Sequence, residues 1–160
     1  MSCDFNDKKI DLETSTGGNY EQYNINTKNK FYNDFVNNKV YRNGRKISAG
    51  NNEHEIEECY NHLTSKGAID NARYPDLRRF EAIYILKDIL TNDKCNKCSN
   101  YYVWEKEEKY LKEKIFCPDV NYLIILAKRK YVYKIVSAYI IESKSKSSKL
   151  IAEYEKCKNK

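Results

Sequence analysis

The sequence predicts an α+β fold, in which N-terminal helices pack on a four-stranded antiparallel β meander and a helix ends the chain. Apolar residues recur at intervals of three and four through most of the first half, a spacing typical of amphipathic helices. From about residue 100 the period changes to alternation, which is typical of strands. The links between these strands are short, and short links join antiparallel neighbours.

The length of 160 residues is most simply that of one domain with its own hydrophobic core. Residues 1–16 are polar and lack periodicity, so we expect a flexible N-terminal arm. The remainder, 17–160, is predicted to be a single domain. Its parts are a mainly helical segment, an antiparallel sheet and a closing helix, expected at 17–92, 100–142 and 145–157.

Three helices are expected before the sheet. Asn19 is a suitable N-cap for the first. The second is expected over 53–66, with Gly67 at the position where a glycine commonly ends a helix. The third is expected to start at Pro75 and to run to about Leu90, because proline lacks an N–H that the first helical turn does not use.

The fourth strand, expected over 132–141, carries two hydroxyl groups. Because side chains alternate along a strand, one face is expected to present Tyr133, Ile135, Ser137 and Tyr139. The other face, with Val136 and Ala138, is expected to pack on the helices. Hydroxyls on an open sheet face near cations can bind phosphate, although an ordinary half-exposed strand gives the same pattern. The segment 37–52, which holds two glycines, is expected to be a long loop with a short extended piece at Lys39–Arg42.

The charge balance permits a polyanionic partner. The chain has 29 basic and 23 acidic residues, a net charge of +6. No apolar run approaches the roughly 18 residues of a membrane span. The six cysteines lack the density of a secreted disulfide scaffold. We therefore expect a cytoplasmic protein without membrane contact.

Three arginines, Arg73, Arg78 and Arg79, surround Pro75. Arg79 lies one helical turn before Ile83 and therefore flanks the apolar stripe of the third helix. A guanidinium beside a hydrophobic core is costly unless it has a partner or a function. The alternative to a functional arginine is an ion pair with a neighbouring acid.

His62 lies near the end of the second helix, next to an apolar residue. Histidine can both accept and donate a proton near neutral pH, which makes His62 a candidate for proton transfer. A structural histidine is the alternative at this position. His54 lies among glutamates and is expected to be a solvated surface residue.

Four segments together resemble a known family. They are His-Leu-Thr-Ser at 62–65, Arg-Tyr-Pro-Asp-Leu-Arg-Arg-Phe-Glu at 73–81, Asn-Tyr-Leu-Ile-Ile-Leu at 121–126 and Ile-Val-Ser-Ala-Tyr-Ile at 135–140. In this order they resemble the phage-encoded nuclease branch of the barnase–EndoU–colicin–RelE-like (BECR) group. The resemblance covers roughly residues 60–155. Serine at 137 and phenylalanine at 80 depart from the family, which more often has threonine and cysteine there.

This resemblance implies a metal-independent endoribonuclease that acts as a toxin in phage–host or mobile-element conflict. In that chemistry a ribose 2′-hydroxyl attacks the adjacent phosphate and leaves a cyclic phosphate and a 5′-hydroxyl. The resemblance also implies RNA, either tRNA or mRNA, as the substrate. It implies no cofactor, and an antitoxin or immunity protein that neutralises the enzyme.

The resemblance also assigns roles to single residues. His62 would transfer protons, and Arg79 would stabilise the pentavalent phosphate. Ser137 and Tyr139 would bind the phosphate or orient the attacking hydroxyl. No residue is expected to bind a metal. The residues expected to bind substrate are Arg73, Arg78, Lys128 and Lys130.

Two other readings use different residues. A non-catalytic RNA- or protein-binding module with the same fold would use the basic segments 128–130 and 144–149. A small zinc-binding protein would use Cys95 and Cys98, but a structural zinc usually needs four ligands and no second Cys-x-x-Cys pair is present. Cys117 would have to complete such a site together with Cys59 or His62.

Overall fold

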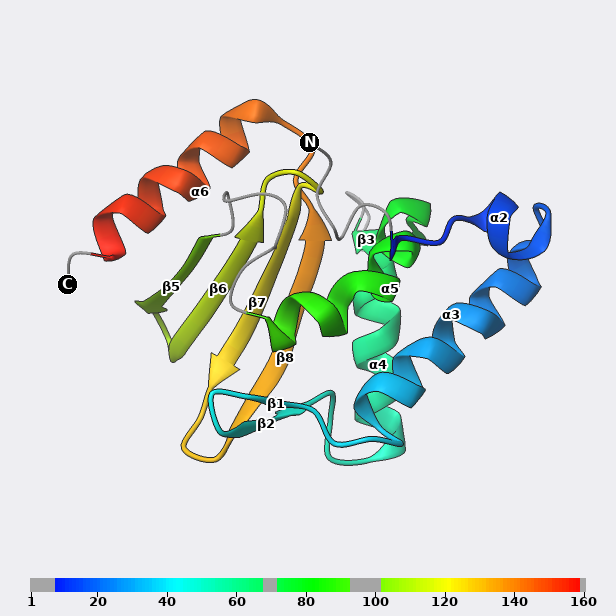
Figure 1. The fold of residues 1–160 in the computed structure, drawn as a ribbon, viewed down its shortest axis with the longest axis horizontal. Coiled ribbons are helices and arrows are strands. Elements are labelled where there is room, and N and C mark those ends of the chain that lie inside the picture. The colour runs from blue at the N-terminus through cyan, green and yellow to red at the C-terminus, as the bar shows by residue number, and fades with distance from the viewer. Residues whose placement is uncertain (1–7, 68–71, 93–101, 159–160) are drawn as a thin grey trace.

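The computed structural model describes residues 8–67, 72–92 and 102–158. The chain has the expected α+β architecture, with N-terminal helices, an antiparallel meander and a C-terminal helix (Figure 1). The helices are α2 (Leu12–Thr16), α3 (Tyr20–Phe35), α4 (Glu53–Thr64), α5 (Leu77–Thr91) and α6 (Lys144–Cys157). The strands of the main sheet are β1 (Tyr41–Arg42), β2 (Arg45–Ser48), β5 (Tyr102–Glu107), β6 (Leu111–Cys117), β7 (Tyr122–Lys128) and β8 (Val132–Ile140). A separate hairpin pairs β3 (Ser65–Gly67) with β4 (Arg73–Pro75).

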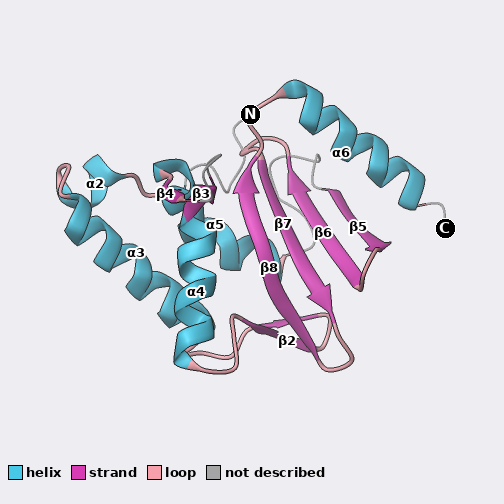
Figure 2. Cartoon of the chain, turned by 180° about the vertical axis from the view of Figure 1, so that it is seen from behind, coloured by secondary structure: helices cyan, strands magenta, loops and turns pink. Residues whose placement is uncertain are grey.

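The main sheet has six strands in the order β1-β2-β8-β7-β6-β5. The meander β5 to β8 is antiparallel throughout, as the short links predict. β2 pairs with the first residues of β8 in parallel, with Lys46 opposite Val132. The second half of β8 extends beyond this pairing, and α4 lies beside it (Figure 2).

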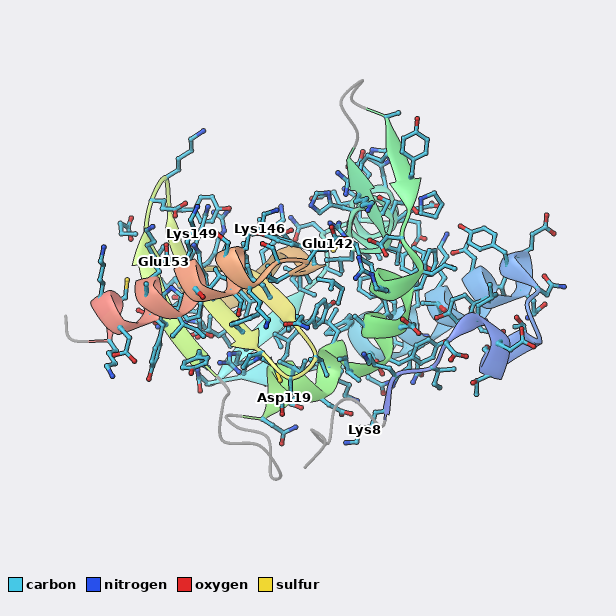
Figure 3. All side chains as sticks on the ribbon, turned by 90° about the horizontal axis from the view of Figure 1, so that it is seen from above. Lys8, Asp119, Glu142, Lys146, Lys149 and Glu153 are labelled. Carbon is cyan, nitrogen blue, oxygen red and sulfur yellow. The ribbon has the colours of Figure 1, made fainter. Side chains whose placement is uncertain are left out.

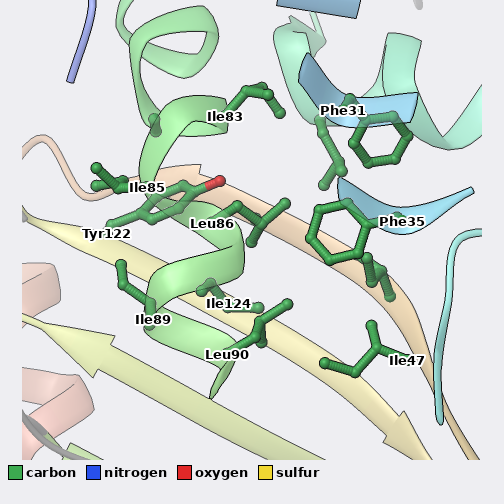
Figure 4. Close-up of a cluster of buried hydrophobic side chains, with 14 of the residues drawn as sticks. Phe31, Phe35, Ile47, Ile83, Ile85, Leu86, Ile89, Leu90, Tyr122 and Ile124 are labelled. Atoms are coloured by element: carbon green, nitrogen blue, oxygen red, sulfur yellow. The ribbon is translucent and has the colours of Figure 1, made fainter. Parts of the chain in front are cut away.

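One face of the sheet packs on α3, α4 and α5 and forms the main core. The helical stripe predicted in α5 is buried, with Phe80 3% exposed and Ile83, Leu86 and Leu90 fully buried. These side chains meet the strands at residues such as Ile124 (Figure 4). Burial of apolar surface on this scale is the main stabilising contribution to such a domain.

The opposite face of the sheet carries a smaller core under α6. Trp104, Phe116, Leu123 and Ile141 are buried there, whereas no residue described in α6 is itself buried. Glu153 attaches the helix by accepting hydrogen bonds from Trp104 Nε1 at 2.8 Å, Lys106 Nζ at 2.6 Å and Lys114 Nζ at 2.9 Å. These cations and hydrogen bonds outweigh the effect of partial burial and hold the pKa of Glu153 at about 2.

Several predicted boundaries were wrong. Residues 12–16 form α2 instead of belonging to a loose arm, because the Asp11 carboxylate caps them by accepting from Thr14 N at 2.7 Å. The segment 37–52 contains β1 and β2, since it finds a partner in β8 that is distant in sequence. The first strand of the meander was predicted to begin at residue 100. Residues 100 and 101 lie outside the described residues, which resume at Tyr102.

The hairpin between α4 and α5 was also not predicted. α4 ends at Thr64, and Gly67 lies in β3 instead of ending the helix. Pro75 lies in β4 opposite Ser65, so it precedes α5 instead of starting it. Asp76 is the N-cap, and its carboxylate accepts a hydrogen bond from Arg78 N at 3.0 Å.

The predicted faces of β8 are confirmed for Ala138 and Tyr139 but were wrong for Tyr133 and Ile135, because the strand carries an irregularity. Ile125 lies opposite Ser137, and the next residue of β7, Leu126, lies opposite Ile135, so that Val136 is an extra residue. Beyond an extra residue, side chains point to the face opposite to the one that strict alternation would predict. Tyr133 and Ile135 are therefore buried in the main core with Ala138. Tyr139 instead packs with the smaller core on the other face, and Ser137, two residues before it, shares its side of the strand.

Candidate active site

The end of α4, the β3–β4 hairpin and the start of α5 meet beside the second half of β8 (Figure 2). The C-terminal carbonyls of a helix lack partners within the helix and carry partial negative charge. Here the Ser65 carbonyl, immediately after α4, accepts from Arg73 Nη2 at 2.7 Å and from Arg79 Nη1. Two of the arginines singled out in the sequence therefore converge on one helix end.

Arg73 donates most of its hydrogen bonds to groups at the end of α4. Its Nη2 also donates to the His62 carbonyl at 3.1 Å, and its Nε donates to Ser65 Oγ at 2.9 Å. These bonds fix the cation in β4 directly beside the backbone of His62. Arg73 therefore contributes its charge to the site while its donors serve the fold.

Arg79 is more deeply placed than the other two arginines, with its side chain 15% exposed. Its guanidinium lies 5.6 Å from the centre of the Tyr139 ring, and its Nε is 3.8 Å from Asp76 Oδ2. That distance is too long for a hydrogen bond, and Arg79 Nε has no hydrogen-bond partner among the described residues. Burial lowers the pKa of Arg79, although the group stays charged at neutral pH.

His62 lies on the exposed side of α4, between two hollows. The larger has a volume of about 600 Å³ and is also lined by Arg73 and Phe80. The smaller, of about 210 Å³, is lined by residues of α4 together with Lys134, Ile135 and Val136. Partial burial, followed by the charges of Arg73 and Arg79, lowers the pKa of His62 from its ordinary value of 6.5. The imidazole is therefore neutral at physiological pH and able to accept a proton.

The two hydroxyl residues of β8 are placed differently. Tyr139 is half-buried beneath the Arg79 guanidinium and lines a hollow under α6. Ser137 is half-buried on the same side of the strand, next to Val136, which lines the smaller hollow with His62. The structure thus brings Arg79 and Tyr139 together, but Ser137 and Tyr139 lie on the face of the sheet opposite to the main core, whereas His62 belongs to α4 on the main-core side.

Of the other predicted substrate-binding residues, Arg78 lies beside Arg79 in the first turn of α5, whereas Lys128 and Lys130 lie at the β7–β8 hairpin. Arg78 forms an exposed ion pair with Glu142, whose position is labelled in Figure 3. Glu142 also lies 3.7 Å from Lys66 Nζ. Lys128 pairs with Glu105, and Lys130 lies over the Tyr131 ring at 5.3 Å. Both lysines belong to the β7–β8 hairpin. At about 3.3 Å per strand residue, the six residues from the hairpin end of β8 to Tyr139 span roughly 20 Å.

The sequence reasoning missed several residues that line the larger hollow with His62. Glu58 and Asn61 precede His62 by four residues and one residue on the same helix, and Tyr20 and Asn24 come from α3. Glu58 and His62 share a face because residues four apart are neighbours on a helix. That spacing could have identified Glu58 from the sequence, whereas Tyr20 and Asn24 are brought there only by the packing of α3.

The described residues include no group of three or more His, Cys, Asp or Glu side chains that could hold a metal ion. Cys95 and Cys98, the proposed zinc ligands, lie outside the described residues. Cys117 is fully buried, and burial raises the pKa of the Cys59 thiol to about 12. Cys59 is therefore a poor thiolate ligand in this conformation.

Comparison of the chain with protein-family models, with curated proteins and with solved structures gives no match. Across the described part of the chain, each helix is too short or too polar to cross a membrane.

Proposed function

We propose that the protein is a metal-independent endoribonuclease that cleaves RNA by attack of a ribose 2′-hydroxyl on the adjacent phosphate. The observation that carries the proposal is the combination of His62 and Arg79. An imidazole with a lowered pKa lies in the field of a half-buried guanidinium that has an unpaired Nε. Proton transfer and charge stabilisation are the two requirements of this reaction.

In this mechanism His62 accepts the proton of the 2′-hydroxyl as the bond to phosphorus forms. The bond between phosphorus and the 5′-oxygen breaks, and the 5′-oxygen takes up a proton from water, so that the products are a 2′,3′-cyclic phosphate and a 5′-hydroxyl. Arg79 stabilises the charge that builds on the phosphoryl oxygens, and Tyr139, held under its guanidinium, orients the phosphate. Ser137 is available on the same side of β8 to donate a further hydrogen bond.

A second candidate function is a non-catalytic RNA-binding module with the same fold. The observation that favours it is the use of Arg73 and Arg79 as donors to the carbonyls at the end of α4. Arginines held in this way add positive potential but have fewer donors left for a transition state. The two functions differ in one respect, because a binding module retains RNA affinity and makes no cuts.

The biological role that accompanies this proposal is that of a cytoplasmic toxin from a phage or mobile element, which an antitoxin or immunity protein neutralises. The test is induction of the protein in a bacterium, followed by sequencing of RNA 5′-hydroxyl ends. We expect growth arrest with discrete new ends in tRNA or mRNA, and neither effect with His62→Ala. Normal growth and an unchanged set of RNA ends at confirmed expression of folded protein would contradict the proposal.

A further inference from the structure

The larger hollow beside His62 has features that the cleavage chemistry alone does not use. Its volume of about 600 Å³ lies within the usual range for small-molecule sites. Besides Arg73 and His62, its lining includes aromatic, amide and carboxylate side chains of α3, α4 and α5, together with residues at the end of α4 and in the β3–β4 hairpin. We propose that this hollow binds an unpaired nucleobase of the RNA, next to the phosphate at His62. This inference rests on the proposed function.

The aromatic part of the hollow is fixed in place. Tyr20 is 39% exposed, and its ring meets Phe80 edge to face at 5.9 Å. Phe80 is in turn held by Tyr23 at 5.7 Å and by Tyr60 at 6.4 Å. A tyrosine with an exposed ring and a supported edge is a platform on which a base can stack, and all four bases offer a suitable π-face.

The polar part of the hollow suits a base better than a phosphate. Asn24 Oδ1 accepts from the Tyr60 hydroxyl at 2.8 Å, which leaves the amide NH₂ as the donor end of this side chain. Asn61 offers a second amide, and Glu58, whose Oε1 lies 3.1 Å from His54 Nε2, offers a carboxylate. A carboxylate repels phosphate but accepts hydrogen bonds from the ring and exocyclic N–H groups of bases.

The position of His62 links the base to the reaction. His62 and Glu58 line both hollows, so a single strand that crosses α4 has its phosphate at the imidazole and its base in the larger hollow. The next nucleotide then faces the smaller hollow, where Lys134 supplies a cation. Single-stranded RNA is recognised in this way by stacking and by contacts to base edges.

The test is the titration of the full chain with the four ribonucleoside 3′-monophosphates, with inorganic phosphate as the probe that lacks a base. Binding is followed by NMR at the side-chain amides of Asn24 and Asn61 and at the His62 ring. We expect at least one nucleotide to bind more tightly than phosphate and to shift the amide signals, while phosphate shifts only His62. Equal affinity for all five ligands would overturn the proposal.

Variants separate stacking from general effects. Tyr20→Ala should weaken nucleotide binding by about 5- to 100-fold, because loss of one base stack costs this much, and Tyr20→Phe should retain binding. Tyr41→Ala is the matched control, since Tyr41 is 54% exposed in β1, outside the lining of the hollow. Tyr20→Ala that binds nucleotides as the wild type does, while folded by circular dichroism, would contradict a base site.

The outcomes also distinguish this inference from the proposed function. Nucleotide binding that depends on Tyr20, in a protein that does not cut RNA, would support the base site and reject the nuclease. RNA cleavage with no preference for nucleotides over phosphate would support the nuclease and reject the base site.

Discussion

Two arginines that lie against the sheet differ in how their charges are paired. Arg42 has a side chain 3% exposed, and its Nε donates to Glu113 Oε2 at 2.6 Å. Its Nη1 donates to the Leu90 carbonyl at 2.9 Å. Arg79 is only slightly more exposed, but its nearest carboxylate is 3.8 Å away and its Nε lacks a hydrogen bond.

The difference lies in how each positive charge is neutralised. Glu113 neutralises Arg42 directly, so little of that charge acts on its surroundings. Arg79 donates to a neutral carbonyl, lies over an aromatic ring and forms an ion pair with Asp76 at 3.8 Å, a distance too long for a hydrogen bond, so its charge is neutralised less directly than that of Arg42. Its field therefore reaches His62, where it contributes to the lowered pKa. Arg42 is therefore a structural cation, and Arg79 is the one of the two that the proposed mechanism can use.

The largest expected effect concerns Arg42. Arg42→Ala leaves Glu113 buried without its cation, and breaking a buried ion pair in this way costs about 3–5 kcal/mol. Urea denaturation should show the free energy of unfolding falling by this amount. A loss below about 1 kcal/mol would show that Arg42 is not the structural cation of the pair. The double variant Arg42→Met/Glu113→Leu is the control, because replacement of both partners by apolar residues is often close to neutral.

Arg79→Ala should act on function more than on the fold. Loss of one preorganised donor for a developing anionic charge typically lowers the rate about 10²–10³-fold, whereas stability should fall less than in Arg42→Ala. Arg79→Lys should restore part of the rate, because an ammonium keeps the charge but not the fork of donors. Arg78→Ala is the matched control, since Arg78 is an exposed neighbour paired with Glu142. Cleavage by Arg79→Ala at the wild-type rate would remove Arg79 from the mechanism.

The pH dependence sharpens the same comparison. The pKa of His62 is lowered, so a base that must be neutral becomes active as the pH rises through a value below 6.5. In Arg79→Gln one of the two cations near His62 is lost, and the pKa should rise towards its ordinary value. NMR titration of the His62 ring measures this directly, with Arg78→Gln as the control that leaves the pKa unchanged. A His62 pKa that does not move in Arg79→Gln would show that the field of Arg79 does not reach the imidazole.

The smallest effect is expected at the far end of β8. Lys128 is paired with Glu105 in the β7–β8 hairpin, remote from His62, although the sequence suggested it as a substrate contact. Lys128→Ala should therefore change the cleavage rate less than about twofold and the stability by about 0–1 kcal/mol. If Lys128→Ala lost as much cleavage rate as Arg79→Ala, the prediction would be wrong, and the RNA would have to extend along the sheet as far as the β7–β8 hairpin. Steady-state cleavage assays of both variants give the comparison.

Periodicity was sufficient to predict the local elements. The stripe of α5 and the meander from β5 to β8 follow from spacings within short segments and from short links. The β2–β8 pair joins residues far apart in sequence, and no local pattern in 37–52 indicates it. The short hairpin at Ser65 and Pro75 was missed for a similar reason, since helix-ending glycines and helix-starting prolines also occur in turns.

The site shows the same limit. The helix-end position of His62 and the core-flanking position of Arg79 could be read from the sequence, and both side chains lie where those positions predict. The extra residue at Val136 could not be predicted from the sequence, because a shift in strand register does not change the pattern of a run of apolar residues. It reversed the face assigned to Tyr133 and Ile135 relative to Tyr139. Tyr20 lines the larger hollow only because α3 packs beside α4, and sequence periodicity does not predict that packing.

The most direct test of the central claim is a cleavage assay of the purified protein on end-labelled single-stranded RNA in the presence of EDTA. The proposed mechanism predicts cuts that leave 2′,3′-cyclic phosphate and 5′-hydroxyl ends. It also predicts a rate about 10²–10⁴-fold lower for His62→Ala at unchanged RNA affinity, and a wild-type rate for His54→Ala, whose side chain is 81% exposed. Cleavage that is abolished by EDTA, or that proceeds equally fast in His62→Ala, would contradict it.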